Sequence, residues 1–367
     1  MNLFTDWFKR SFSDPQVVIL GLFLIIGLAI IIGLGKWLAP MFASLVIAYL
    51  LEGVVGRLRK LGMPRFPAVL IVFVIFLTVL FFLLFGLVPM LSRQLTQLVQ
   101  QFPNYISQGQ ALLTELPAKY PQLISEEQIQ AFTASLGDEF ASLGQRVLSW
   151  SLASVAGVVV LVVYVVLVPV LVFFLLKDKR LLIDWAVSYL PKERHLASVV
   201  WAESEAQIAN YVRGKVMEIL IVGAATFVTF RFLGLQYSAL LATVVGFSVL
   251  IPYIGAAVVT IPIAFVAFFQ YGWNWDFGQV LIAYAIIQAL DGNVLVPLLF
   301  SEVVDLHPIA IILAILVFGG FWGLWGVFFA IPLATLVNAV LRAWPKKSAD
   351  DNSEPELETE PAGPASR

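Results

Sequence analysis

The chain has 367 residues, of which 60% are hydrophobic and 13% are charged, and its formal net charge at pH 7 is −2. Several apolar runs are as long as a membrane-spanning helix, so the composition excludes a soluble globular protein. The partner that it predicts is the lipid bilayer itself. The lack of cysteine excludes disulfides, iron–sulfur clusters and thiol catalysis, and the charge balance gives no reason to expect nucleic acid.

The first 91 residues predict three transmembrane helices. The first covers 17–34, the second returns across the membrane from Pro40 to about Val55, and the third covers 66–91.

A polar insertion of amphipathic helices, 92–148, follows outside the cytoplasm. Its apolar stripes indicate ordinary packing or subunit contact rather than a ligand-binding domain. We expect the third helix to continue into the insertion until prolines break it, at Pro103, Pro117 and Pro121.

The second half predicts a fourth transmembrane helix at 149–176, then amphipathic helices along the cytoplasmic membrane surface at 177–213. Residues 214–344 form a transmembrane core, and 345–367 an acidic disordered tail. The core contains a fifth span, a broken hairpin, a sixth span and a second broken hairpin. The fold class is therefore an all-α polytopic membrane protein with about six full transmembrane helices and two broken or re-entrant hairpins.

The distribution of Lys and Arg predicts the orientation. With both termini in the cytoplasm, 17 of these residues fall in inner segments and 5 in outer ones. Positive charge favours the cytoplasmic side, so we predict an N-in, C-in topology.

The stretch Tyr237–Tyr271 predicts the first hairpin. Its arm before Pro252 has 14 residues, about 21 Å of helix, which is short of a bilayer core of about 30 Å. The alternative, two short full spans, gives the same charge count.

A second segment resembles this first hairpin. It repeats the glycines and the Ile-Pro pair of the hairpin at Gly319-Gly320, Gly326 and Ile331-Pro332. Two such segments that enter from opposite sides indicate an inverted repeat with a transport site at its interface, unless the short match is coincidence.

Asp291 is the strongest candidate for a transport residue. It lies about 22 Å along its span, at the predicted depth of the Pro252 turn. A carboxylate there needs a cavity or a partner, and the free N–H groups at the half-helix beginning at Gly255 could provide one. The alternative is that Asp291 only caps its own kinked helix. The predicted transport pathway comprises Asp291, Asn293, Gln288, Pro252, Tyr253, Gly255, Gly246, Gly320 and Gly326.

Other polar residues rank lower. His307 and Glu302 could couple transport to protons or ions together with Asp291, although His307 before Pro308 also suits a simple helix start. Glu52, Lys215 and Glu218 suit interfacial pairing near helix ends. Catalytic and nucleotide-binding motifs are absent from the sequence, so we expect no enzyme, cofactor or metal site.

Five runs of the sequence form a recognisable set of motifs. They are Pro169 to Asp178, the hairpin from Gly246 to Gly255, the segment from Gln288 to Pro297, Leu306-His-Pro308, and the closing run to Pro332. These motifs resemble the AI-2E transporter family, with the PerM-like permeases of Gram-negative bacteria as the nearest branch. The resemblance implies an inner-membrane homo-oligomer, with a pentamer as one expectation, and either autoinducer-2 efflux or Na⁺(Li⁺)/H⁺ antiport.

These observations predict a secondary transporter or permease for a small polar solute, possibly autoinducer-2, since no ATP-binding motif is present. The first alternative is a Na⁺(Li⁺)/H⁺ antiporter in which Asp291 binds a proton or a monovalent cation. The second is a membrane scaffold or envelope-interaction protein that acts through the insertion at 92–148.

Overall fold

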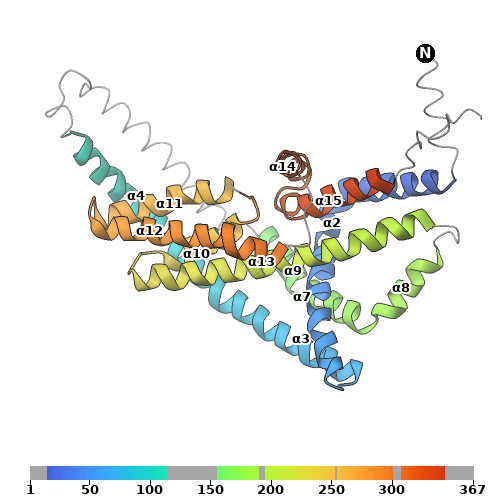
Figure 1. The fold of residues 1–367 in the computed structure, drawn as a ribbon. Coiled ribbons are helices and arrows are strands. Elements are labelled where there is room, and N and C mark those ends of the chain that lie inside the picture. The colour runs from blue at the N-terminus through green and yellow to red at the C-terminus, as the bar shows by residue number, and fades with distance from the viewer. Residues whose placement is uncertain (1–14, 115–154, 190–194, 253, 301–306, 344–367) are drawn as a thin grey trace, which may run out of the picture.

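The computed structural model describes residues 15–114, 155–189, 195–252, 254–300 and 307–343, and every regular element in these ranges is helical. Figure 1 shows the arrangement of these helices. In chain order they are α2 (Pro15–Lys60), α3 (Arg65–Phe82), the π-helix η1 (Leu83–Leu87), α4 (Val88–Thr114), α7 (Val155–Lys177), α8 (Lys179–Ser188), α9 (His195–Phe232), α10 (Ser238–Ser248), α11 (Ile254–Tyr271), α12 (Trp275–Leu290), the π-helix η2 (Asp291–Leu295), α13 (Val296–Phe300), α14 (Pro308–Trp322) and α15 (Leu324–Ala343).

The predicted return between the first two spans is wrong. Helix α2 is continuous over 46 residues and has Pro40 inside it. Figure 1 shows α2 changing direction along its length, which an internal proline can cause because it removes one backbone hydrogen bond. Proline therefore bends this helix instead of starting a new one. The N-in, C-in orientation stays a prediction.

Helices α3, η1 and α4 continue one another, which confirms that the third span extends beyond the apolar run. Pro103, however, lies inside α4 and does not break it. The stripe on α4 packs against the rest of the protein, because Phe102 contacts Phe265 and Tyr105 stacks on Phe269 of α11. Ordinary packing thus explains this stripe. Pro117, Pro121 and the remainder of the insertion lie outside the described residues.

Helix α9 is the central element. It contains 38 residues and joins the predicted surface stretch from His195 to Arg213 and the fifth span into one helix. The helix continues because the sequence between His195 and Phe232 has no proline. Helices α2, α10, α12, α13 and α15 all contact α9, and it contributes buried side chains to two hydrophobic cores. A third core joins α2, α3 and α7.

Both predicted breaks are present. Helix α10 ends at Ser248 and α11 begins at Ile254, while α14 and α15 are separated at Gly323, whose φ of 58° suits a residue without a side chain. Helix α10 has 11 residues, about 17 Å, and α11 has 18, about 27 Å. The length of α11 therefore agrees better with a short full span than with half of a re-entrant hairpin.

Four helical stretches among the described residues are long and apolar enough to cross a membrane. They are Trp37–Lys60, Arg65–Ala111, Ile254–Tyr271 and Trp275–Phe300. The described residues thus form a helical fold whose long apolar helices fit an integral membrane protein. The number of spans, the inverted repeat and the domain boundaries stay predictions.

Candidate functional site: a polar cluster around a broken helix

Asp291 lies at the point where its helix is interrupted. Helix α12 ends at Leu290, and the chain continues as the π-helix η2 before α13. A π-turn inserts one extra residue into a helix and often marks a functional position. Within the described ranges, the Oδ1 atom of Asp291 is buried without a hydrogen-bond partner, and so is Nε2 of Gln288, one turn earlier. One acceptor and one donor are therefore available on the same side of this helix.

An ion pair on α9 is buried beside this π-turn. Nζ of Lys215 donates to Oε2 of Glu218 at 2.7 Å, and the two side chains are only 5% and 3% exposed. Asp291 interacts electrostatically with both residues. A buried ion pair is costly to desolvate and contributes little net stability, so stability alone does not explain its presence.

Lys215 also connects α9 to the first hairpin. Its Nζ donates a second hydrogen bond, of 2.8 Å, to the backbone oxygen of Val249, which follows the last residue of α10. The carbonyl end of a helix carries partial negative charge and favours such a cation. The same Nζ lies 5.3 Å from the ring centroid of Phe300 on α13. One ammonium group thus contacts α9, the hairpin turn and the helix that follows the π-turn.

Tyr211 completes the cluster. It is buried two turns before Glu218 on the same face of α9, and its hydroxyl has no hydrogen-bond partner among the described residues. It interacts electrostatically with Glu218. We use the name polar cluster for Tyr211, Lys215, Glu218, Gln288 and Asp291.

The sequence prediction of the partner of Asp291 was incomplete. The N–H of Gly255 is already bonded to the oxygen of Ile251 at 2.9 Å, and the nearby cation is Lys215. The sequence indicates only interfacial pairing for Lys215 and Glu218, and it does not single out Tyr211. Their spacing of four and three residues places them on one helical face, a pattern that could have indicated a polar site within α9.

The predicted glycines serve close backbone packing. A Cβ atom on Gly255 would lie 2.7 Å from the carbonyl carbon of Ser248, and one on Gly246 3.0 Å from the backbone oxygen of Ile219. Gly326 packs equally closely on Phe318 at the second break, whereas the space around Gly320 is open. The two hairpins therefore pack in the same way. In each, a glycine after the break lies against the backbone near the end of the preceding helix.

The hairpins meet through apolar side chains. Leu250, at the first turn, belongs to the same buried core as Phe328 and Ile331 of α15. A small apolar pocket lies between Pro252 and Ile254 on one side and α14 on the other, where it is lined by Ile311, Ile312, Ile315 and Leu316. Pro252 thus contributes to an apolar contact between the hairpins.

The remaining predicted residues lie apart from the polar cluster or outside the described ranges. Asn293 is exposed, and its Nδ2 donates to the oxygen of Ala289 in its own helix. His307 precedes α14, and its Nδ1 accepts from the N–H of Ile309, as a simple helix start requires. Tyr253 and Glu302 are not among the described residues. In the part of the chain that the structure describes, no three His, Cys, Asp or Glu residues are grouped to hold a metal ion.

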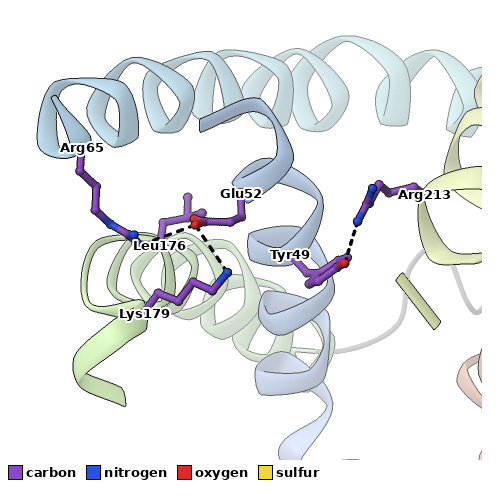
Figure 2. Close-up of polar contacts among 6 residues, drawn as sticks. All are labelled: Tyr49, Glu52, Arg65, Leu176, Lys179 and Arg213. Atoms are coloured by element: carbon purple, nitrogen blue, oxygen red, sulfur yellow. Dashed lines mark hydrogen bonds and ion pairs between the residues drawn. The ribbon is translucent and has the colours of Figure 1, made fainter. Parts of the chain in front are cut away.

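A second charged group joins four helices. Figure 2 shows Glu52 of α2 between Arg65 of α3 and Lys179 of α8, with Oε1–nitrogen distances of 3.7 and 3.5 Å. Arg65 also donates to the oxygen of Leu176 near the end of α7, at 2.9 Å. Glu52 therefore forms the pairing expected from the sequence. Nearby, Arg213 of α9 donates to the hydroxyl of Tyr49 at 2.8 Å.

An apolar helical chain with charged groups buried beside interrupted helices has the features of a membrane transport protein. Comparison with known sequences agrees. Residues 19–346 match the model of the family described as "AI-2E family transporter". The chain belongs to this family.

Relatives named for transport are similar over most of their length. "Putative permease PerM" of Escherichia coli (strain K12) is 46% identical over 345 residues, 94% of this chain and 98% of the relative. "Putative transport protein YueF" of Bacillus subtilis (strain 168) is 29% identical over 306 residues, 82% of each chain. A "Putative transport protein" of Haemophilus influenzae is 28% identical over 316 residues, 83% and 86% of the two chains. These names describe transport proteins rather than enzymes.

Proposed function

We propose that this protein is a secondary transporter of the bacterial inner membrane that moves a small polar solute past the polar cluster. The main support is that three polar atoms of the cluster are buried without a hydrogen-bond partner among the described residues: the Tyr211 hydroxyl, Gln288 Nε2 and Asp291 Oδ1. A buried polar group without a partner costs about 1–3 kcal/mol, so a ligand that bonds to it gains affinity.

The available atoms favour a ligand with hydroxyl groups. A hydroxyl can donate to Asp291 and accept from Gln288, whereas a bare cation would satisfy only the carboxylate. Lys215 next to Asp291 also disfavours a cation, because two positive charges would then share one buried carboxylate. Autoinducer-2, the solute implied by the family resemblance, carries hydroxyl groups and is the first solute to test. Transport that is driven by the solute's own gradient, or by an ion that moves down its gradient, needs no ATP site.

The test is uptake of autoinducer-2 into inside-out vesicles that contain the full chain. We expect Asp291→Asn and Gln288→Leu each to lower the initial rate about tenfold or more, since each removes a hydrogen bond and leaves another group unpaired. Asn293→Ala is the matched control, because Asn293 is exposed and bonds only to its own helix. Unchanged uptake in both cluster variants would remove this cluster from the transport pathway.

The second candidate is Na⁺(Li⁺)/H⁺ antiport, which the two carboxylates Glu218 and Asp291 around one lysine support. Such a group could exchange a proton for a monovalent cation while Lys215 moves between the two carboxylates. Proton flux in proteoliposomes under an imposed Na⁺ gradient separates the candidates. An antiporter gives a flux that Asp291→Asn abolishes, and the solute transporter gives none. Assembly as a homo-oligomer is compatible with both functions and stays a prediction.

A further inference from the structure

The fold brings two basic segments together that are far apart in the sequence. One is the last turn of α2, with Arg57, Arg59 and Lys60, just before the turn to α3. The other is the junction of α7 and α8, with Lys177 and Arg180. The contacts of Arg65 with Leu176 and of Glu52 with Lys179 hold the two segments next to each other, as Figure 2 shows.

This region carries an excess of positive charge. Residues 52–65 and 177–188 contain seven Lys or Arg and three Asp or Glu. Glu52 is engaged by Arg65 and Lys179, and Asp178 pairs with Lys177 at 3.6 Å. Four exposed cations take part in no ion pair within the described ranges: Arg57, Arg59, Lys60 and Arg180.

Exposed apolar side chains border these cations. Helix α8 contacts α7 but has few other neighbours in the described structure. Leu181, Trp185 and Tyr189 lie on one face of this helical segment and are 69%, 61% and 75% exposed. On the neighbouring turn, Leu61 is 83% exposed and Phe66 is 56% exposed. Exposed apolar side chains, among them a Trp and a Tyr, thus lie on the same two segments as the cations.

We propose that this surface binds an anionic phospholipid. We call it the junction surface and define it as Arg57, Arg59, Lys60, Lys177 and Arg180 with the apolar face of α8. The phosphate groups would lie against the cations, and the acyl chains against Leu181 and Trp185. Tryptophan and tyrosine favour the headgroup level of a bilayer, and basic groups near a bilayer attract anionic lipids.

The apolar residues decide between an anionic lipid and a soluble anion. A nucleic acid or a free phosphate would bond to the cations but leave Leu61, Phe66 and Trp185 exposed to water. A phospholipid matches both halves of the surface. The same charge excess also places the junction surface on the side that the Lys and Arg distribution predicts to be cytoplasmic.

The absence of cysteine allows a direct test on the full chain. Ser188→Cys is a conservative change at an exposed position of α8, and it provides a single attachment site for a fluorophore. The labelled protein is placed in phosphatidylcholine nanodiscs that contain a small fraction of brominated phosphatidylglycerol or brominated phosphatidylcholine. Bromine quenches the fluorophore on contact, so the amount of quenching reports which lipid gathers at α8.

We expect brominated phosphatidylglycerol to quench at a severalfold lower fraction than brominated phosphatidylcholine. Each basic residue near the surface contributes at most about fivefold in lipid preference, so Arg59→Gln with Lys60→Gln should remove most or all of this severalfold preference. The control pair, Arg93→Gln with Arg231→Gln, removes the same charge from exposed positions on α4 and α9 and should leave the preference unchanged.

Three results would overturn the proposal. Equal quenching by the two brominated lipids would show that α8 does not select the headgroup. An equal loss in the control pair would assign the preference to the overall charge of the protein. Relief of quenching by added glycerol phosphate would identify a soluble anion as the ligand. None of these results depends on transport, so they leave the proposed function of the polar cluster unaffected.

Discussion

Gly255 has no room for a side chain, so Gly255→Ala should destabilise the first hairpin. The new Cβ would lie 2.7 Å from the carbonyl carbon of Ser248 and closer still to its oxygen. Carbon atoms in contact are about 3.5–4.0 Å apart, so the two arms must separate by roughly 1 Å at the turn. Overpacking of this kind costs about 1–3 kcal/mol, and we expect the upper end because both clashing partners are backbone or Cβ atoms that cannot rotate away.

Thermal unfolding of the purified protein in detergent, followed by tryptophan fluorescence, measures this cost. Gly320→Ala is the control, since an added Cβ at Gly320 meets nothing within 4 Å. Alanine is also favoured over glycine in helices by about 0.5–1 kcal/mol, so this control should be neutral or slightly more stable. Equal unfolding temperatures for the two alanine variants would refute the packing argument at Gly255.

Three further predictions concern single contacts. Lys215→Met leaves Glu218 buried without its partner and should lower the free energy of unfolding by about 3–5 kcal/mol, whereas adding Glu218→Met should restore most of it. A double variant as unstable as the single one would contradict this pairing. Tyr284→Phe removes the 2.8 Å hydrogen bond to the oxygen of Ala256 and should cost about 1 kcal/mol in the same assay; a cost near zero would mean that this bond is not formed in solution. Glu52→Gln should cost at most about 1 kcal/mol, because its ion pairs are long and partly exposed, and the difference from wild type should shrink in high salt. A difference independent of salt would argue against an ionic contribution.

The breaks in the two hairpins follow from local chemistry, which is why the sequence was sufficient to predict them. Pro252 and Gly255 interrupt one apolar segment, and Gly323 interrupts the other with a positive φ. The same reasoning failed at Pro40 and Pro103, which lie inside helices α2 and α4. A proline in an apolar helix can either bend it or end it, and the outcome depends on the helices packed around it.

The candidate site was predictable only in part. Asp291 and Gln288 are unusual residues for an apolar span, and their chemistry alone identified them. Lys215, Glu218 and Tyr211 lie about 75 residues earlier in a stretch that looks like an ordinary helix end. They form part of the candidate site because α9 packs against the π-turn, and this contact cannot be predicted from the local sequence.

The sequence by itself determined the class of protein, the two breaks and the carboxylate in the broken helix, because hydrophobicity, proline and glycine act locally. Only the tertiary structure decided that Lys215 interacts electrostatically with Asp291 and donates a hydrogen bond to the hairpin turn at Val249. The same holds for the basic turns of α2–α3 and α7–α8, which form one surface only after folding. The physical reason is that electrostatic interactions act through space, so the position of a charge along the chain does not give its partner.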